Sequence, residues 1–409
     1  MTESEIRRMM DRAVRRALRG HGGAEPNPMV GCVLVAPDGS VVAEGHHARC
    51  GGPHAEAAAL AAAGARARGT TAIVTLEPCA HRGRTGPCAD ALIEAGVARV
   101  LYAVADPNPL ACGGAERLRA AGIPASLFPH AGADELARPF LKRVATGLPW
   151  VLAKWAQSID GAIALASGES KWISSARSRA MVHRERGRVD AVLTGIGTVL
   201  ADDPLLTPRG GVRRRTPLRI IYDPNAETPP GARVLHGETR EGAEPASGAS
   251  PSRAPARSAS GASDHPAVYT PAHPSAHPPA PAPDHRAILL VDPARDAAAE
   301  ARLATLRAEG ADAVELGADR SIAPALRALA ARGVATVLVE CGGGLLGKLL
   351  AEELVDEAWV FVAPILVGER DAVRAVRGLS PTSVGACPRA RLLSVRRRGD
   401  DTLLHYRFG

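Results

Sequence analysis

The chain has 409 residues, which is too long for one ordinary compact domain and makes two domains the starting expectation. Hydrophobic residues make up 46% of the chain and aromatic residues only 3%, which argues against aromatic stacking platforms for single-stranded nucleic acid. Basic residues outnumber acidic residues by 50 to 43, without the run of like charge typical of a nucleic-acid tail. Only four basic residues are lysines: Lys142, Lys154, Lys171 and Lys348. This arginine usage is typical of coding in a GC-rich genome, and it also suits the binding of anionic substrates.

Targeting signals are absent from the sequence. No run approaches eighteen apolar residues, so we expect no membrane span. The segment 4–19 is amphipathic with mixed charge and lacks the apolar core of a signal peptide. The seven cysteines show no disulfide-framework spacing, which favours a reducing cytoplasm.

Hydrophobic periodicity predicts alternating helices and strands in the first third of the chain. We expect helices over 6–18, 53–63 and 87–96, and strands over 30–35, 41–43, 71–76 and 97–104. The turn Pro37–Gly39 would join the first two strands as a hairpin. The alternation predicts an α/β fold with a largely parallel sheet covered by helices on both faces.

The pattern restarts near 146–149, where we place a domain boundary. Further strands are expected at 151–155, 191–194, 218–222, 288–291, 337–339 and 358–362, with a hairpin over 391–408. The segment 237–285 is rich in Pro, Ala and Ser and cannot bury enough apolar surface to offset its ordering entropy, so we expect a disordered insertion.

The clearest candidate for a catalytic site consists of one His, two Cys and one Glu. A catalytic zinc site needs three protein ligands, an open position for water and a carboxylate that is not itself a ligand. His54, Cys79 and Cys88 supply the ligands, and Glu56 supplies the proton shuttle of a cytidine-deaminase-type reaction. Eight residues separate the two cysteines, where the common pattern has two. A structural zinc site or unrelated buried thiols remain the alternatives.

Several stretches around these residues resemble the RibD family of bifunctional riboflavin-biosynthesis deaminase/reductases. They are Pro26–Cys32, His54–Glu56, Thr75–Cys79, Gly83–Thr85 and Asp106–Pro109, and the wide cysteine spacing is also typical of that family. The resemblance implies a cytidine-deaminase-like three-layer α/β/α domain over 1–147 and a phosphoribosyl pyrimidine substrate. Asn27 would bind the ring, while Arg84 and Thr85 would approach the sugar phosphate. Asn27 as a turn residue and Arg84 as a solvated loop residue are the alternatives.

The second half contains a glycine run, Gly342 to Gly344, between a predicted strand and a helix. Such a run lets backbone amides approach a phosphate, or it serves only a tight turn. Residues 150–409 resemble the reductase half of the same family, which implies a dihydrofolate-reductase-like α/β domain over 148–409 that binds NADPH. The residues expected to face the cofactor are Ala156, Trp172, Thr198, Asp202, Gly342, Gly343, Gly344, Leu345, Leu346 and Gly347.

The same resemblance assigns a substrate-binding set in this half: Ser170, Arg186, Leu206, Arg209 and Glu340. Arg186 and Arg209 are expected to bind phosphate. Trp172 could instead be a core residue. The proton donor stays open among Lys154, Asp202 and Glu340.

The chain departs from the family pattern at two places. The run 110–114 lacks an expected basic residue, and 223–229 lacks an Arg that often precedes Thr-Pro. The leading hypothesis is a two-step enzyme that uses zinc and NADPH, is cytoplasmic and, by resemblance, homodimeric. A deaminase with a degenerate second domain, a non-enzymatic binding protein with structural zinc, and a nucleoside or RNA deaminase are the alternatives.

Overall fold

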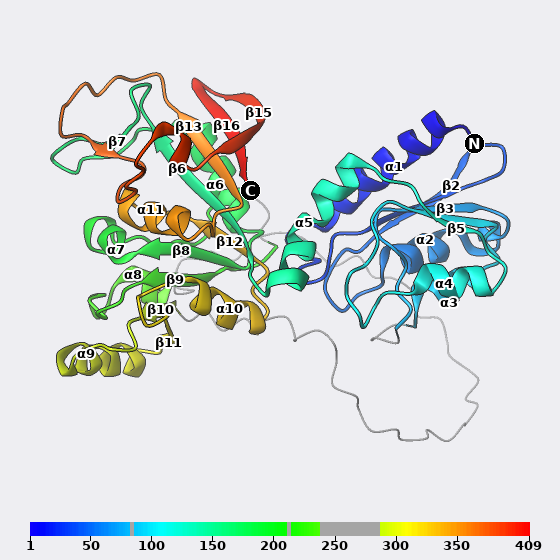
Figure 1. Ribbon diagram of the computed structural model, residues 1–409, viewed down its shortest axis with the longest axis horizontal. Helices are drawn as coiled ribbons and strands as arrows, with labels where there is room; N and C mark the ends of the chain where they lie inside the picture. The colour runs from blue at the N-terminus through cyan, green and yellow to red at the C-terminus, as the bar shows by residue number, and fades with distance from the viewer. Residues whose placement is uncertain (82–85, 211–213, 238–286) are drawn as a thin grey trace, which may run out of the picture.

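The computed structural model describes residues 1–81, 86–210, 214–237 and 287–409 (Figure 1). It contains a five-stranded and a nine-stranded sheet, which we assign to two units, and a small two-stranded sheet in the second unit. The N-terminal unit contains α1 (Glu3–Ala17), β1 (Gly31–Val35), β2 (Val41–His46), α2 (Ala55–Ala63), β3 (Thr71–Val74), α3 (Cys88–Glu94), β4 (Arg99–Tyr102), α4 (Gly114–Ala120), β5 (Ala125–Leu127) and α5 (Ala131–Thr146). Most of the predicted insertion lies outside the described residues.

The C-terminal unit begins at β6 and ends at β16. Its elements are β6 (Trp150–Gln157), β7 (Ala162–Ala164), α6 (Ala176–Arg186), β8 (Ala191–Gly195), α7 (Ile196–Asp202), β9 (Leu218–Tyr222), α8 (Arg233–His236), β10 (Ala287–Val291), α9 (Ala297–Ala308), β11 (Asp312–Glu315), α10 (Ala323–Ala331), β12 (Thr336–Val339), α11 (Gly343–Ala351), β13 (Glu357–Val362), β14 (Val373–Arg374), β15 (Ala390–Arg398) and β16 (Asp401–Phe408). The predicted boundary at 147–148 falls between α5 and β6, and the division into domains there stays a prediction.

The sheet of the N-terminal unit has the order β2-β1-β3-β4-β5. β1 runs antiparallel to both β2 and β3, whereas β3, β4 and β5 run parallel. The expectation of a largely parallel sheet therefore holds only for β3, β4 and β5. The cause is the tight turn at Gly39, which folds β2 back on β1 as the predicted hairpin. Helices α1 and α5 lie together on one side of the sheet, and α2, α3 and α4 form the other layer (Figure 1).

Two glycines let helices lie directly on this sheet. A Cβ at Gly31 would lie 2.0 Å from the Ala13 carbonyl oxygen of α1, and a Cβ at Gly45 would lie 2.0 Å from the Ala55 carbonyl oxygen of α2. Only glycine tolerates such close backbone approach. The second contact fixes the start of α2, which carries His54 and Glu56.

The nine-stranded sheet has the order β11-β10-β9-β8-β12-β6-β13-β16-β15. Counted along the sheet, the strands from β11 through β6 to β13 run parallel to one another. β16 and β15 form an antiparallel hairpin at one edge. The central strands are buried along their length, and their Val, Ile and Leu side chains pack against helices on both faces. The predicted C-terminal hairpin is confirmed. No helix among the described residues is long and apolar enough to cross a membrane.

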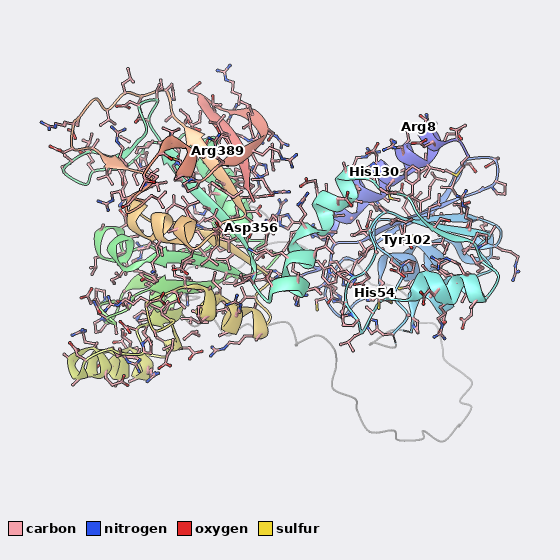
Figure 2. The ribbon with its side chains drawn as sticks, viewed as in Figure 1. Arg8, His54, Tyr102, His130, Asp356 and Arg389 are labelled. Atoms are coloured by element: carbon pink, nitrogen blue, oxygen red, sulfur yellow. The ribbon has the colours of Figure 1, made fainter. Side chains whose placement is uncertain are left out.

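Charged side chains join the two units at two places. On one side, α5 contacts the C-terminal unit through Lys142, whose Nζ lies 2.6 Å from Asp356 Oδ2, and through the Glu135–Arg407 ion pair. Figure 2 shows Asp356 on the face of its unit that is turned toward α5. On the other side, the loop before β1 contacts α6, where His21 Nε2 lies 3.4 Å from Glu185 Oε1.

Replacing Glu185 by Gln is expected to raise thermal stability above neutral pH. Burial raises the pKa of Glu185 to about 7, with Arg188 opposing the shift. The folded state therefore holds a proton that the unfolded state releases between about pH 4.5 and 7. Stability falls as pH rises through that window, by roughly 2–3 kcal/mol. E185Q should melt higher than the parent at pH 8 and match it at pH 5, with the exposed variant E94Q unchanged at both. A lower melting temperature of E185Q at pH 8 would contradict this, since it would mean that the ionised Glu185 is stabilising.

Candidate active sites

The predicted metal ligands converge at the edge of the N-terminal sheet. His54 is the N-cap residue of α2, Cys88 is the first residue of α3, and Cys79 lies in the loop after β3. Both cysteines are buried, and Figure 2 places His54 within this unit. Their side-chain donor atoms all lie within 4.8 Å of one another. The structure thus brings together three residues that are up to 34 positions apart.

The distances fit a tetrahedral zinc ion. His54 Nδ1 lies 3.2 Å from Cys88 Sγ and 3.6 Å from Cys79 Sγ. Zinc bonds to nitrogen and sulfur at standard lengths would hold such atoms about 3.5 Å apart. Hydrogen bonding from Cys88 lowers the pKa of Cys79 to about 4 despite its burial. Because a thiol must lose its proton to bind a metal ion, this lowered pKa favours Cys79 as a zinc ligand.

Glu56 lies in the first turn of α2, is 3% exposed and lines the cavity that His54 and Cys79 also border. Burial raises its pKa to about 7. It is not one of the three clustered ligands, so it meets the requirement for a carboxylate next to the metal and free of it. The cluster therefore has the composition of a catalytic zinc site and not of a four-ligand structural site.

Replacing Gly114 by Ala is expected to damage this cluster from a distance. A Cβ at position 114 would lie 1.6 Å from the carbonyl oxygen of Pro78, so the backbone at Cys79 must move. Measured zinc per chain after dialysis should fall at least severalfold in G114A. The control G86A, whose Cβ would meet nothing within 4 Å, should retain zinc. Full zinc occupancy in G114A would contradict the account.

Asn27 lines the same cavity, which has a volume of about 60 Å³. Its Nδ2 lies 3.1 Å from His47 Nε2, and its Oδ1 is buried with no hydrogen-bond partner in the described part of the chain. A buried acceptor without a partner is rare in proteins and points to a ligand. The predicted residues Arg84 and Thr85 lie outside the described residues.

Sequence reasoning missed several side chains of this cavity. His47, Glu77, His81, Asp106 and Asn108 also line it. Glu77 holds the loop after β4, because its two carboxylate oxygens accept from the amides of Asp106 (3.3 Å) and Ala115 (3.0 Å). The stretch Asp106–Pro109 was noted only as a resemblance, and its polar residues were the available signal. His47 follows directly after β2, and no local pattern marks it.

The C-terminal unit has a larger cavity of about 900 Å³ at the carboxyl ends of its parallel strands. It lies where β6, β8 and β12 end and where α7 and α11 begin. Ligands of open α/β sheets bind at this edge. The predicted residues that line the cavity are Ala156, Ser170, Trp172, Arg186, Thr198, Asp202, Leu206, Arg209, Glu340, Gly342, Gly344 and Leu345.

Three of the predicted cofactor residues do not line this cavity. A Cβ at Gly343 would lie 2.5 Å from the Arg374 carbonyl oxygen, and one at Gly347 would lie 1.8 Å from that of Arg377. Leu346 is a core residue, 2% exposed. Because α11 begins at Gly343, the 3.6-residue period places these three positions on its packed face. They support the packing of α11 instead of facing the cavity.

The glycines that do line the cavity keep it open. A Cβ at Gly342, Gly344 or Gly197 would meet nothing within 4 Å. Eight basic side chains also border the cavity: Lys154, Lys171, Arg179, Arg186, Arg209, Arg233, Lys348 and Arg377. The volume, the glycine edge and the positive lining fit a phosphate-rich dinucleotide such as NADPH. The stretch 223–229 lacks the expected Arg, but these other cationic side chains border the cavity of the same unit.

Trp172 is 71% exposed, so its interpretation as a core residue is wrong. Its ring lies at the cavity with the Arg179 guanidinium 4.5 Å from the ring centroid. Of the three proton-donor candidates, Asp202 pairs with Lys171 at 2.9 Å and Glu340 pairs with Arg186. Burial lowers the pKa of Lys154, which also lines the cavity.

Arg186 and Glu340 form a bidentate ion pair at the floor of the cavity. Arg186 Nε donates to Glu340 Oε1 at 2.5 Å and Nη2 donates to Oε2 at 3.0 Å. Although burial raises the pKa of Glu340, the guanidinium holds it below its ordinary value. One edge of the Arg186 fork is thereby occupied, so only its remaining N–H groups are available to a phosphate.

Two family models match the chain. The model for the cytidine and deoxycytidylate deaminase zinc-binding region matches residues 3–104. The model for the RibD C-terminal domain matches residues 149–245 and 286–404. The first match contains His54, Cys79 and Cys88, and the second contains the residues of the larger cavity.

Whole proteins are similar as well. The riboflavin biosynthesis protein RibD of Haemophilus influenzae is 36% identical over 403 residues, which is 97% of this chain and 96% of the relative. The Escherichia coli protein of the same name is 47% identical over 246 residues, 56% of this chain and 67% of the relative.

Two solved structures match the whole chain. Acinetobacter baumannii RibD superposes with a TM-score of 0.78 at 32% identity and 100% coverage of both chains. The diaminohydroxyphosphoribosylaminopyrimidine deaminase/5-amino-6-(5-phosphoribosylamino)uracil reductase of Thermotoga maritima gives 0.74 at 29% identity, covering 100% of this chain and 99% of that one. With this geometry and these matches, the chain belongs to the RibD family.

Proposed function

We propose that this bifunctional enzyme of riboflavin biosynthesis deaminates 2,5-diamino-6-ribosylamino-4(3H)-pyrimidinone 5′-phosphate by hydrolysis and then reduces the ribosyl group to ribityl with NADPH. The observation that carries the first step is the convergence of His54, Cys79 and Cys88 around the buried Glu56. The positively lined cavity of the C-terminal unit supports the second step. We assign residues 1–147 to the deaminase domain and 148–409 to the reductase domain.

In the deaminase, His54 Nδ1 and the two thiolates are the proposed zinc ligands. A zinc ion held there would supply a water molecule of lowered pKa as the nucleophile. Glu56 would carry one proton of that water to the ring nitrogen and then the second proton to the amine, which leaves as ammonia. Asn27 Oδ1, which has no protein partner, accepts a hydrogen bond from an N–H of the pyrimidine. Arg84 and Thr85 remain proposed contacts of the sugar phosphate.

In the reductase, the cofactor residues are the predicted ones that line the cavity. Bound NADPH supplies hydride, and the protein positions the reacting carbon. Arg209 and the free N–H groups of Arg186 bind the substrate phosphate, while Ser170, Leu206 and Glu340 border the substrate. The buried Lys154 is the favoured proton donor of the three candidates, because Asp202 and Glu340 are held in ion pairs.

A homodimer is also proposed, through the edge of the nine-stranded sheet. β15 is one of the two edge strands of this sheet, and Leu392 and Val395 on it are 49% and 57% exposed. An edge strand presents unpaired N–H and C=O groups with which a second chain can pair. We also propose a cytoplasmic location, which the seven free cysteines of the structure support.

Zinc depletion separates the two proposed activities. Chelator-treated full-length protein should lose ammonia release and recover it with added zinc. It should still oxidise NADPH when given the deaminated intermediate, since the proposed cofactor cavity contains none of the zinc ligands. Ammonia release that is unchanged in protein shown to be zinc-free would overturn the deaminase assignment.

A further inference from the structure

Asn27 lies on a loop that is itself neither helix nor strand. The chain forms turns from His21 to Asn27, between α1 and β1. The Asn27 amide donates to the Ala24 carbonyl, and its Nδ2 contacts His47. Asn27 lines the cavity, and its Oδ1 is buried with no hydrogen-bond partner among the described residues. Small displacements of a substrate-positioning group reduce rates strongly. The position of Asn27 therefore depends on whatever holds this loop from outside.

Within the N-terminal unit the loop packs on the backbone after β2, where a Cβ at Gly23 would lie 2.5 Å from the Ala48 carbonyl oxygen, and a few hydrogen bonds hold it. Arg143 of α5 donates from Nη2 to the Pro26 carbonyl at 2.8 Å, and the Cys50 amide donates to the Gly23 carbonyl at 2.8 Å. The acidic side chain of the loop, Glu25, is 7% exposed. Within the loop its Oε1 accepts from the Gly22 amide at 3.1 Å.

The charged partner of Glu25 comes from the other unit. Arg215 donates from Nη2 to Glu25 Oε2 at 3.3 Å and to the Glu25 carbonyl at 3.4 Å. Its Nε donates to the Gly22 carbonyl at 3.0 Å. One guanidinium thus binds the loop at two residues, and the second of them is two positions before Asn27. Charge-assisted hydrogen bonds of this kind are the strong ones.

Arg215 is itself fixed to the interior of the C-terminal unit. Its Nη1 donates to Asp190 Oδ1, and the Asp190 side chain is completely buried. Asp190 Oδ2 also accepts from the Ala335 amide at 3.0 Å and the Thr336 amide at 2.9 Å, which ties it to the start of β12. Arg215 therefore links a rigid point of one sheet to the loop of the other unit.

The backbones of the two units also pack closely at the same place. Gly22 has φ +83°, and a Cβ there would lie 2.9 Å from Arg188 Cα. The loop thus rests directly on the residues that follow α6. Because the backbones are in contact here, Arg215 has little room to keep its hydrogen bonds if the loop moves.

We infer that Arg215, a residue of the reductase half, is a positioning residue for the deamination step. It holds Glu25 and thereby sets Asn27 Oδ1 at the pyrimidine. The inference rests on the proposed deaminase function and on the proposed role of Asn27. It means that the first reaction depends on contact with the unit that performs the second, although no reductase cavity residue takes part.

Full-length variants test this with a double-mutant cycle. R215Q is expected to lower kcat/KM for ammonia release about tenfold or more, and R215K should recover part of the loss. Zinc content and NADPH oxidation of the deaminated intermediate should stay within twofold of the parent. N27A should lose activity by itself, and R215Q should add little in the N27A background, because both changes remove the same contact.

The control is K142Q, which removes the Lys142–Asp356 contact between the units without touching the loop. It should leave ammonia release within twofold. Two results would overturn the inference: equal losses in K142Q and R215Q, or losses of R215Q and N27A that multiply. If the parent itself releases no ammonia when zinc-replete, the proposed function fails instead, so the two failures are distinguishable.

Discussion

Glu56→Gln is expected to abolish deamination while leaving the metal cluster intact. Gln keeps the size and hydrogen bonding of the side chain but cannot accept a proton from water. General acid–base groups contribute roughly 10²–10⁴-fold, so ammonia release should fall by about 10³-fold. Because Glu56 is not one of the three clustered donors, zinc per chain should be unchanged. Ammonia release and bound zinc are the two measurements.

The matched control is E94Q on the exposed side of α3, which should retain full activity. E56Q should also oxidise NADPH normally when supplied with the deaminated intermediate. An E56Q protein that loses zinc together with activity would identify Glu56 as a structural element of the cluster. An E56Q protein with full activity would exclude the proposed proton transfer.

Arg186→Met is expected to have the largest effect on the second half reaction. It removes the bidentate partner of Glu340 and leaves a buried carboxylate with no guanidinium beside it. Breaking a buried pair from one side destabilises by roughly 3–5 kcal/mol. We therefore expect a lower melting temperature and a fall of at least about 10²-fold in NADPH oxidation with the deaminated intermediate.

A second variant separates stability from chemistry. R186M/E340Q removes both charges and should regain much of the melting temperature of the parent, since no buried charge is left alone. Its reductase activity should stay low, because the proposed phosphate contacts of Arg186 are still missing. Recovery of activity together with stability would mean that the pair serves folding only.

The local motifs were the part of the site that the sequence predicted well. His54 and Glu56 are separated by one residue at a helix start, and Cys79 and Cys88 follow a strand and open a helix. Such local patterns predict the structure well because each lies within or beside one helix or strand. Most strands of the two large sheets were also predicted, because buried parallel strands are continuous apolar runs. The short edge strands β5 and β11 were missed, because they are largely exposed and lack such a run.

Other features depended on packing that no local pattern records. The glycine run was assigned to the cofactor as a block, yet Gly343 and Gly347 pack against the 374–377 segment and leave Gly342 and Gly344 at the cavity. The sequence also gave no sign that Arg186 pairs with Glu340, 154 positions away. Contacts between the two units, such as Arg215 with Glu25, depend on the same long-range packing.

The central claim is that one chain performs two consecutive reactions. Its most direct test is an assay of the zinc-replete protein on the phosphoribosylaminopyrimidine, recording ammonia and NADPH oxidation separately in the same sample. The account predicts that both proceed and that NADPH oxidation lags behind ammonia release and disappears in E56Q until the deaminated intermediate is added. Ammonia release without any NADPH oxidation, even with the deaminated intermediate supplied, would contradict the claim and leave only a deaminase.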